Sequence, residues 1–196
     1  MPLGVFGGSF NPPHVGHLAV AEACADAAGL DRVLWIPAAT SPHKVGDPSL
    51  APAEARLAMV RAAVEGNDRF AVSDIEIARE GVSYTVDTLR QLAAEGAGPL
   101  ALIVGGDSLA GFPSWREPRA ILDLATLVVY RRPGDAVDLS ALPDWLASAL
   151  TVVEGPSLAV SSTEIRERVA SGQTVRYLVP DVVRTIIEAE GLYGAG

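Results

Sequence analysis

The chain has 196 residues, of which 49% are hydrophobic and 20% charged, and its formal net charge is −9. These values predict one folded α/β domain and argue against a broad nucleic-acid or membrane surface, because such surfaces need clustered Lys and Arg. The one cysteine, Cys24, excludes an internal disulfide, and we expect a cytoplasmic protein without a signal peptide or membrane-spanning segment.

Short aliphatic runs alternate with longer Ala-rich helical runs, which is the pattern of βαβ units around a parallel sheet. The expected strands are Leu3–Phe6, Arg32–Pro37, Phe70–Ile77, Leu100–Val104, Thr126–Tyr130 and Thr151–Val153. The expected helices are His17–Gly29, Ala53–Gly66, Thr85–Gly96 and two later runs over 161–172 and 179–191. Residues 40–52 contain three prolines and no periodicity, which predicts a loop.

We therefore expect an α/β fold, a Rossmann-like doubly wound parallel sheet with a C-terminal helical appendage. A single domain over residues 1–196 is expected, with the C-terminal helical part at about 157–196. In a sheet of order 3-2-1-4-5, strands one and four are neighbours at the point where such folds bind ligands.

The run "GGSFNPPHVGH", from Gly7 to His17, follows the first expected strand. Gly7 and Gly8 allow backbone N–H groups to approach an anion, and the N-terminus of the next helix favours negative charge. His14 and His17 can share one face, but no third or fourth ligand is at hand, so a metal site is not expected. A pair of surface or capping histidines is the alternative.

The segment "GSFNPPHVGH" resembles the nucleotidylyltransferase signature Gly-x-Phe-[Asp/Asn]-Pro-x-His-x-Gly-His. The resemblance implies that His14 and His17 bind the phosphates of ATP and stabilise charge at its α-phosphate. It further implies that the turn residues Gly7, Gly8, Ser9 and Phe10 belong to the ATP site.

The segment "SPHK" contains the only lysine, Lys44, whereas the other fourteen basic residues are all Arg. A flexible, compact ammonium suits contact with a moving phosphate, although a solvated loop charge is the ordinary alternative. The resemblance implies that Lys44 reaches the triphosphate of ATP.

Two segments resemble those of nicotinate-nucleotide adenylyltransferases. In "GVSYTVDTL" a turn leads into a helix that Thr85 could cap, and exposed N–H groups there could hold a carboxylate. In "FPSW", Trp115 could stack on a pyridine ring or be an ordinary half-buried aromatic. The resemblance implies that nicotinate mononucleotide is bound by these residues: Asn11, Ser83, Tyr84, Thr85 and Trp115. Arg116 stands where the family often has an aromatic residue.

The segment "IVGGDS", Ile103–Ser108, is a second glycine turn after a strand. Gly105 and Asp107 are candidates for the ATP site, with Asp107 accepting hydrogen bonds from ribose hydroxyls. A helix-capping role explains Asp107 nearly as well.

The segment "SSTEIR" begins a C-terminal helix. Ser161 and Glu164 fit a capping box, which does not account for Ser162, Thr163 and Arg166. Hydroxyls and a guanidinium at a helix N-terminus suit a phosphate. The resemblance assigns this segment, Ser161 included, to the β- and γ-phosphates of ATP.

The resemblance as a whole implies a nicotinate-nucleotide adenylyltransferase that makes deamido-NAD and pyrophosphate from ATP and nicotinate mononucleotide. The catalytic groups would be His14, His17, Lys44 and Arg166, and Mg²⁺ would arrive with ATP. A related adenylyltransferase for nicotinamide mononucleotide or pantetheine phosphate, and a non-catalytic nucleotide-sensing domain, are the alternatives. No nucleic-acid or membrane partner is expected, and the sequence leaves a homo-oligomer open.

Overall fold

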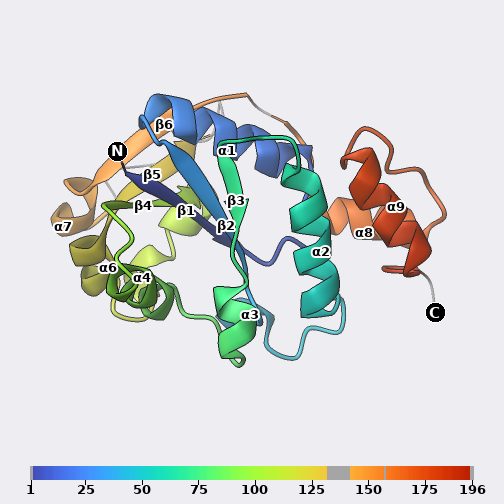
Figure 1. Ribbon diagram of the computed structural model, residues 1–196, viewed down its shortest axis with the longest axis horizontal. Coiled ribbons are helices and arrows are strands. Elements are labelled where there is room, and N and C mark those ends of the chain that lie inside the picture. Colours follow the sequence, from blue (N-terminus) through green and yellow to red (C-terminus); the bar gives the residue numbers. More distant parts are fainter. Residues whose placement is uncertain (1, 132–141, 157, 195–196) are drawn as a thin grey trace. The chain divides into compact units, whose positions relative to one another are not determined.

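The computed structural model describes residues 2–131, 142–156 and 158–194 (Figure 1). The chain divides into two compact units, each made of several chain segments. Unit 1 comprises residues 1–7, 19–34 and 84–157, and unit 2 comprises residues 8–18, 35–83 and 158–196. Ser157, at which we expected the C-terminal part to begin, lies outside the described residues.

Six strands form one sheet in the order β3-β2-β1-β4-β5-β6. The pairs β1–β4, β4–β5 and β5–β6 are parallel, and Leu3 of β1 lies opposite Leu100 of β4. The expected order around strand one and the parallel pairing of strands one and four are therefore confirmed. The strands are β1 (Leu3–Gly8), β2 (Arg32–Pro37), β3 (Phe70–Val72), β4 (Leu100–Gly105), β5 (Ala125–Arg131) and β6 (Leu150–Glu154).

Helices of four to thirteen residues connect these strands or follow them. The α-helices are α1 (Val15–Ala27), α2 (Ala53–Val64), α3 (Ile75–Arg79), α4 (Thr85–Ala94), α5 (Gly106–Leu109), α6 (Pro118–Leu124), α7 (Asp144–Ala147), α8 (Ser162–Ala170) and α9 (Asp181–Ala189). The 3-10 helices are η1 (Pro42–Lys44) and η2 (Phe112–Ser114).

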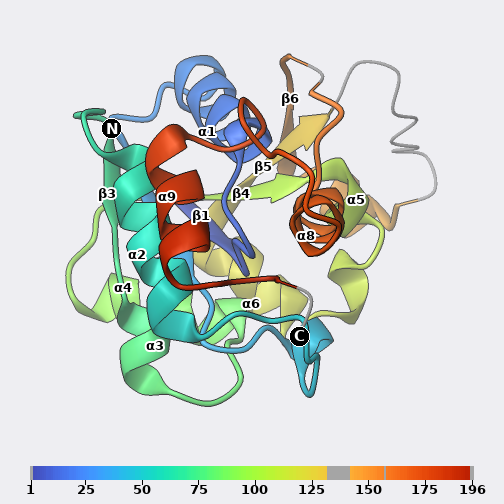
Figure 2. The ribbon, with the colours of Figure 1, turned by 90° about the vertical axis from the view of Figure 1, so that its right-hand side faces the viewer.

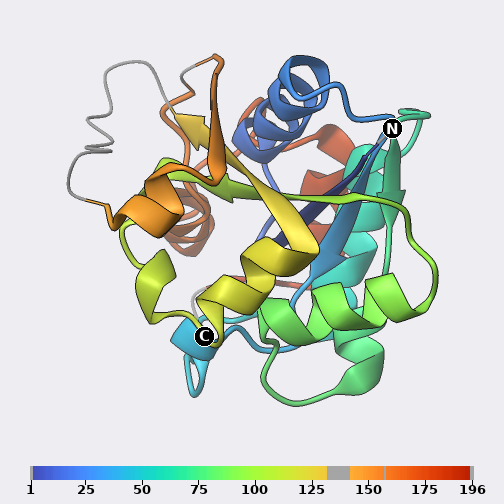
Figure 3. The same ribbon diagram turned by 90° about the vertical axis from the view of Figure 1, so that its left-hand side faces the viewer.

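Unit 1 is centred on β4 and β5, whose residues are almost all buried. Unbroken apolar runs of this kind are typical of parallel strands covered on both faces. Helix α6 packs on β5 and on α4, as Figure 3 shows. Strand β4 ends at Gly105, and Asp107 lies just beyond it in the first turn of α5.

Unit 2 has a core in which α2, α8 and α9 share buried side chains. Met59 of α2, Ile165 of α8 and Val183 of α9 are all fully buried there. Figure 2 shows α9 beside α2. The expected C-terminal helices are confirmed, and they complete the core of this unit together with α2 because their apolar faces need a partner.

The expected strand over Phe70–Ile77 is wrong in its second half. Strand β3 stops at Val72, and Ile75 begins helix α3. The Ser73 hydroxyl accepts a hydrogen bond from the Ile75 N–H at 3.3 Å, which favours a helix start over further extension. Thr85 is also not a cap, because Tyr84 occupies the cap position with an extended backbone and Thr85 lies inside the helix.

Candidate active site

The turn after β1 is anchored in unit 2 by the ring of Phe10. This side chain is buried, and its ring centroid lies 5.2 Å from those of both Trp35 and His17. A Cβ on Gly8 would approach the Phe10 ring to 3.2 Å, closer than a side chain normally sits. Glycine at position 8 therefore allows the backbone to pass directly over the aromatic ring.

His14 and His17 are stacked, with ring centroids 3.7 Å apart and an interplanar angle of 26°. The His14 N–H donates to Nδ1 of His17 at 3.2 Å. Because Nδ1 accepts, the ring proton of His17 lies on Nε2, which is therefore a donor. A Cβ on Gly16 would meet the His14 ring and Val160 at 3.0 Å, so glycine is needed for this stacking.

Through its side chain, Asn11 connects the turn to two other segments of unit 2. Its side chain is buried, and Nδ2 donates to the Ser49 carbonyl at 2.8 Å. Its Oδ1 accepts from the Ala51 N–H at 3.0 Å and from the Tyr193 hydroxyl at 2.8 Å. In this structure both ends of the amide are therefore engaged within the protein.

Lys44 ends η1 and is held within its own loop. Its Nζ lies 2.9 Å from Oδ2 of Asp47, while Oδ1 of Asp47 accepts from the N–H and the hydroxyl of Ser49. The Lys44 ammonium and the Ser49 donors hold the pKa of the Asp47 carboxyl well below its usual range. A chain of contacts thus runs from Lys44 through Asp47 and Ser49 to Asn11.

The N-terminus of α8 is tied to the same turn, 150 residues earlier in the sequence. Ser161 caps the helix by accepting from the Glu164 N–H at 3.1 Å, as expected from the capping box. The Ser162 hydroxyl donates to the Pro12 carbonyl at 2.9 Å, and Arg166 donates to the Asn11 carbonyl at 3.0 Å. The two segments that resemble phosphate signatures are therefore in direct contact.

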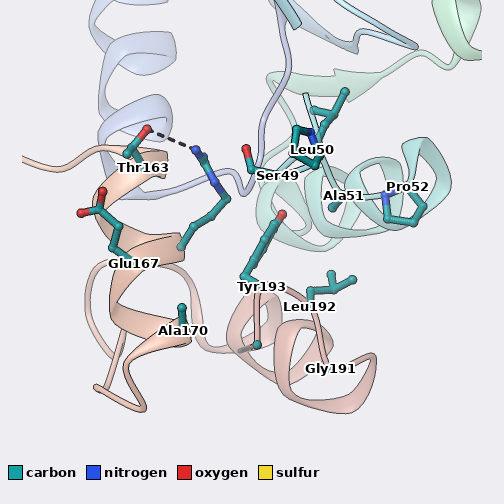
Figure 4. Close-up of a pocket in the computed structure, with 13 residues that line it drawn as sticks. Ser49, Leu50, Ala51, Pro52, Thr163, Glu167, Ala170, Gly191, Leu192 and Tyr193 are labelled. Carbon is teal, nitrogen blue, oxygen red and sulfur yellow. Dashed lines mark hydrogen bonds between the residues drawn. The ribbon is translucent and has the colours of Figure 1, made fainter. Parts of the chain in front are cut away.

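A cavity of about 580 Å³ lies next to this junction (Figure 4). Thr163 and Arg166 of α8 line one side, and the dashed line at Thr163 in Figure 4 is their 3.3 Å hydrogen bond. The segment 48–52 and the chain after α9, including Tyr193, form the remaining walls.

Arg56 is a residue that the sequence interpretation missed. It is 1% exposed on α2, and its guanidinium donates to four backbone carbonyls at 2.7 to 2.9 Å. Burial lowers the pKa of Arg56. Its position on the buried stripe with Met59 and Val60 was the available signal, because an arginine there needs buried partners. The four acceptors are the carbonyls of Ser9, Ala38, Ala39 and Ala51.

Other candidate residues belong to unit 1. Tyr84 caps α4 and Thr85 is its first residue, and the half-buried Trp115 packs against Phe112 with ring centroids 5.1 Å apart. The Arg116 guanidinium lies 4.7 Å above the Tyr84 ring and 3.2 Å from Oδ2 of Asp87. The residue that departs from the family pattern is therefore packed against the start of α4.

The remaining candidates are more scattered. Gly7 is exposed near the end of β1. Asp107 is exposed in the first turn of α5, and the cap residue of this helix is Gly105. Ser83, in unit 2, is buried, and its hydroxyl accepts from the Ala39 N–H at 3.0 Å. Unit 2 brings together, through the contacts described above, Phe10, Asn11, His14, His17, Lys44, Ser162, Thr163 and Arg166.

Comparison with known proteins identifies the family. Residues 5–168 match the family model described as cytidylyltransferase-like. A protein from Roseiflexus sp. (strain RS-1), named as a probable nicotinate-nucleotide adenylyltransferase, is 51% identical over 195 residues, covering 98% of each chain. The chain belongs to the nicotinate-nucleotide adenylyltransferase family. A Salinibacter ruber relative with the same name is 47% identical over 98% of each chain.

The fold of this adenylyltransferase family member also matches a solved structure. The Plasmodium falciparum nicotinic acid mononucleotide adenylyltransferase complexed with NaAD aligns with a TM-score of 0.77 at 16% identity, over 98% of this chain and 97% of that one. The expected Rossmann-like fold and the family resemblance are confirmed. Within residues 2–131, 142–156 and 158–194, no helix is long and apolar enough to span a bilayer.

Proposed function

We propose that this chain transfers the adenylyl group of ATP to nicotinate mononucleotide, giving deamido-NAD and pyrophosphate. The junction between the turn after β1 and the start of α8 supports this proposal most directly. There Ser162 and Arg166 contact the carbonyls of Pro12 and Asn11, next to the stacked pair of His14 and His17. The names of the relatives described above supply the choice of substrates.

In this reaction a phosphate oxygen of the mononucleotide attacks the α-phosphorus of ATP. A new bond forms between them, the bond from the α-phosphorus to the bridging oxygen breaks, and pyrophosphate leaves. The mononucleotide phosphate is already a nucleophile, so the protein acts mainly by positioning two polyanions and stabilising their charge.

The candidate groups differ in what they supply to the charged phosphates. His17 offers a fixed donor at Nε2, because its Nδ1 is held by the His14 N–H. Lys44 and Arg166 supply full positive charges, and the Arg166 guanidinium is oriented by Asn11 and Thr163. Pre-oriented donors of this kind need no reorganisation when charge develops in the transition state.

Mg²⁺ fits the proposal as part of the ATP complex. Within the described part of the chain, no three His, Cys, Asp or Glu side chains are grouped so that they could hold a metal ion. The ion would arrive with ATP and would lower the negative charge of its phosphates. The residues of this chain would then hold the phosphates themselves.

The nicotinate half of the proposal rests on Tyr84, Thr85 and Trp115. The N-terminus of α4 begins at Thr85, and backbone N–H groups there suit a carboxylate. Trp115 is half-buried, and an indole ring suits stacking on a pyridine ring. We also propose a cytoplasmic location, small-molecule substrates without a nucleic-acid or membrane partner, and a homo-oligomer as an open possibility.

The test is pyrophosphate release by the purified protein with ATP and Mg²⁺. Nicotinate mononucleotide, nicotinamide mononucleotide and pantetheine phosphate are supplied in turn, and turnover should be fastest with nicotinate mononucleotide. Equal rates with both pyridine mononucleotides would refute the carboxylate site. Faster turnover of pantetheine phosphate would assign the chain to another adenylyltransferase, and binding of ATP without pyrophosphate release would make it a nucleotide sensor.

A further inference from the structure

Tyr193 occupies an unusual backbone position just after α9. Its φ is +62°, in the left-handed region, which residues other than glycine rarely adopt. Such a conformation persists where surrounding contacts determine it. The Leu192 N–H donates to the Ile187 carbonyl at 3.0 Å, which fixes the chain before Tyr193 to the end of the helix.

The hydroxyl of Tyr193 is directed to one polar atom, Oδ1 of Asn11, at 2.8 Å. The tyrosine ring is half-buried and forms part of the cavity wall shown in Figure 4. Burial raises the pKa of the Tyr193 hydroxyl above its usual range. A partly buried hydroxyl of this kind is stabilised by its acceptor.

The bond matters because Asn11 joins the parts of unit 2 that carry the candidate cations. The Asn11 amide donates to the Ser49 carbonyl and accepts from the Ala51 N–H. The Ser49 hydroxyl donates to Asp47, which forms an ion pair with Lys44. The Asn11 backbone carbonyl accepts from Arg166. With two donors on Oδ1 and an acceptor at Nδ2, the amide has one orientation that satisfies all its partners.

We propose that Tyr193 is a positioning residue of the nucleotide site, which fixes the amide of Asn11 and thereby the segment that carries Lys44. This inference rests on the proposed function, since it concerns the binding of ATP phosphates. Tyr193 acts through Asn11 and is not assigned a contact with the reacting atoms. The segment after α9 thus contributes to ATP affinity through Asn11 in the turn after β1.

The variant Tyr193→Phe removes the hydroxyl and keeps the ring that packs in the wall. We expect KM for ATP to rise about three- to tenfold, equivalent to about 0.7 to 1.4 kcal/mol, with kcat changed less than twofold. Tyr177→Phe is the matched control, because Tyr177 is 82% exposed and also has a positive φ, of +68°. Its KM should equal that of the unmodified protein.

A double-mutant cycle separates positioning from general loosening. If Tyr193 acts on ATP through the loop of Lys44, the effect of Tyr193→Phe on KM should largely disappear in a Lys44→Ala background. Effects of the two substitutions that simply multiply would overturn the inference, as would an unchanged KM in Tyr193→Phe.

Direct binding of α,β-methylene-ATP, measured by titration calorimetry, distinguishes failure of this inference from failure of the proposed function. The Kd should rise in Tyr193→Phe by the same factor as KM and stay unchanged in Tyr177→Phe. If the unmodified protein binds the analogue but turns over no mononucleotide, a weaker Kd in Tyr193→Phe still supports positioning. Equal Kd values for the unmodified protein and Tyr193→Phe, or no binding of the analogue by either protein, would overturn the positioning role of Tyr193.

Discussion

Replacing Arg56 by Met tests whether one buried guanidinium holds the turns of unit 2 together. Hydrogen bonds to a charged group contribute about 1.5 to 3 kcal/mol each, so the four carbonyl contacts of Arg56 represent about 6 to 12 kcal/mol. Desolvation of the cation opposes this by several kcal/mol. We expect Arg56→Met to lower the free energy of unfolding by about 3 to 5 kcal/mol, because Met fills the space and leaves the carbonyls without a donor.

Urea denaturation followed by tryptophan fluorescence measures this change, since the fully buried Trp35 lies in the same unit. Arg61→Met is a matched control on the same helix, because Arg61 makes an exposed ion pair with Asp74 at 3.1 Å. Its loss should stay below about 1 kcal/mol. If Arg56→Met costs no more than Arg61→Met, the assigned role of the buried arginine is wrong.

Three further predictions concern other residues. His17→Ala should lower kcat for pyrophosphate release about 10²- to 10³-fold in protein that still folds, because it removes a fixed donor; undiminished turnover would remove His17 from the mechanism. Because the pKa of Asp47 is lowered in the folded protein, its contribution to stability is full above the ordinary carboxyl pKa of about 3.9 and is lost progressively as pH falls from there toward the lower folded-state pKa. The melting temperature of Asp47→Asn should therefore fall less than that of the unmodified protein between pH 6 and pH 3. Equal decreases would contradict this. Burial raises the pKa of Cys24 to about 12, so a thiol reagent at pH 8 should modify it only after denaturation; rapid labelling of the native protein would show that the helix opens.

Much of the fold could be predicted because the relevant signals are local. The apolar run of Leu100–Val104 and the glycine at position 29, with φ of +59°, mark a buried strand and a helix end without help from distant residues. The second half of Phe70–Ile77 failed because alternating apolar residues predict a strand, whereas the chain forms a short helix there. The Ser73 side chain, which the alternation does not reveal, decides between them.

Short-range contacts of the candidate site could be predicted from the sequence, whereas its long-range contacts could not. Sequence spacing indicated that His14 and His17 share a face, and their rings are indeed stacked. It could not indicate that Arg56 and Tyr193 both bond to the turn after β1. Arg56 is 47 positions from its partner Ser9, and Tyr193 is 182 positions from its partner Asn11. Long-range hydrogen bonds to backbone carbonyls or to one amide oxygen leave no periodic pattern in a sequence.

Lys44, held by Asp47 at 2.9 Å, is the only lysine in the chain. Apart from a free N-terminal amine, amine-directed reagents therefore have a single side-chain target in the whole protein, and it lies in the loop that we expect to contact ATP. A fluorophore or an isotope label attached there would report on that loop alone. The same scarcity means that acylation of one side chain would remove all the lysine charge that this protein has.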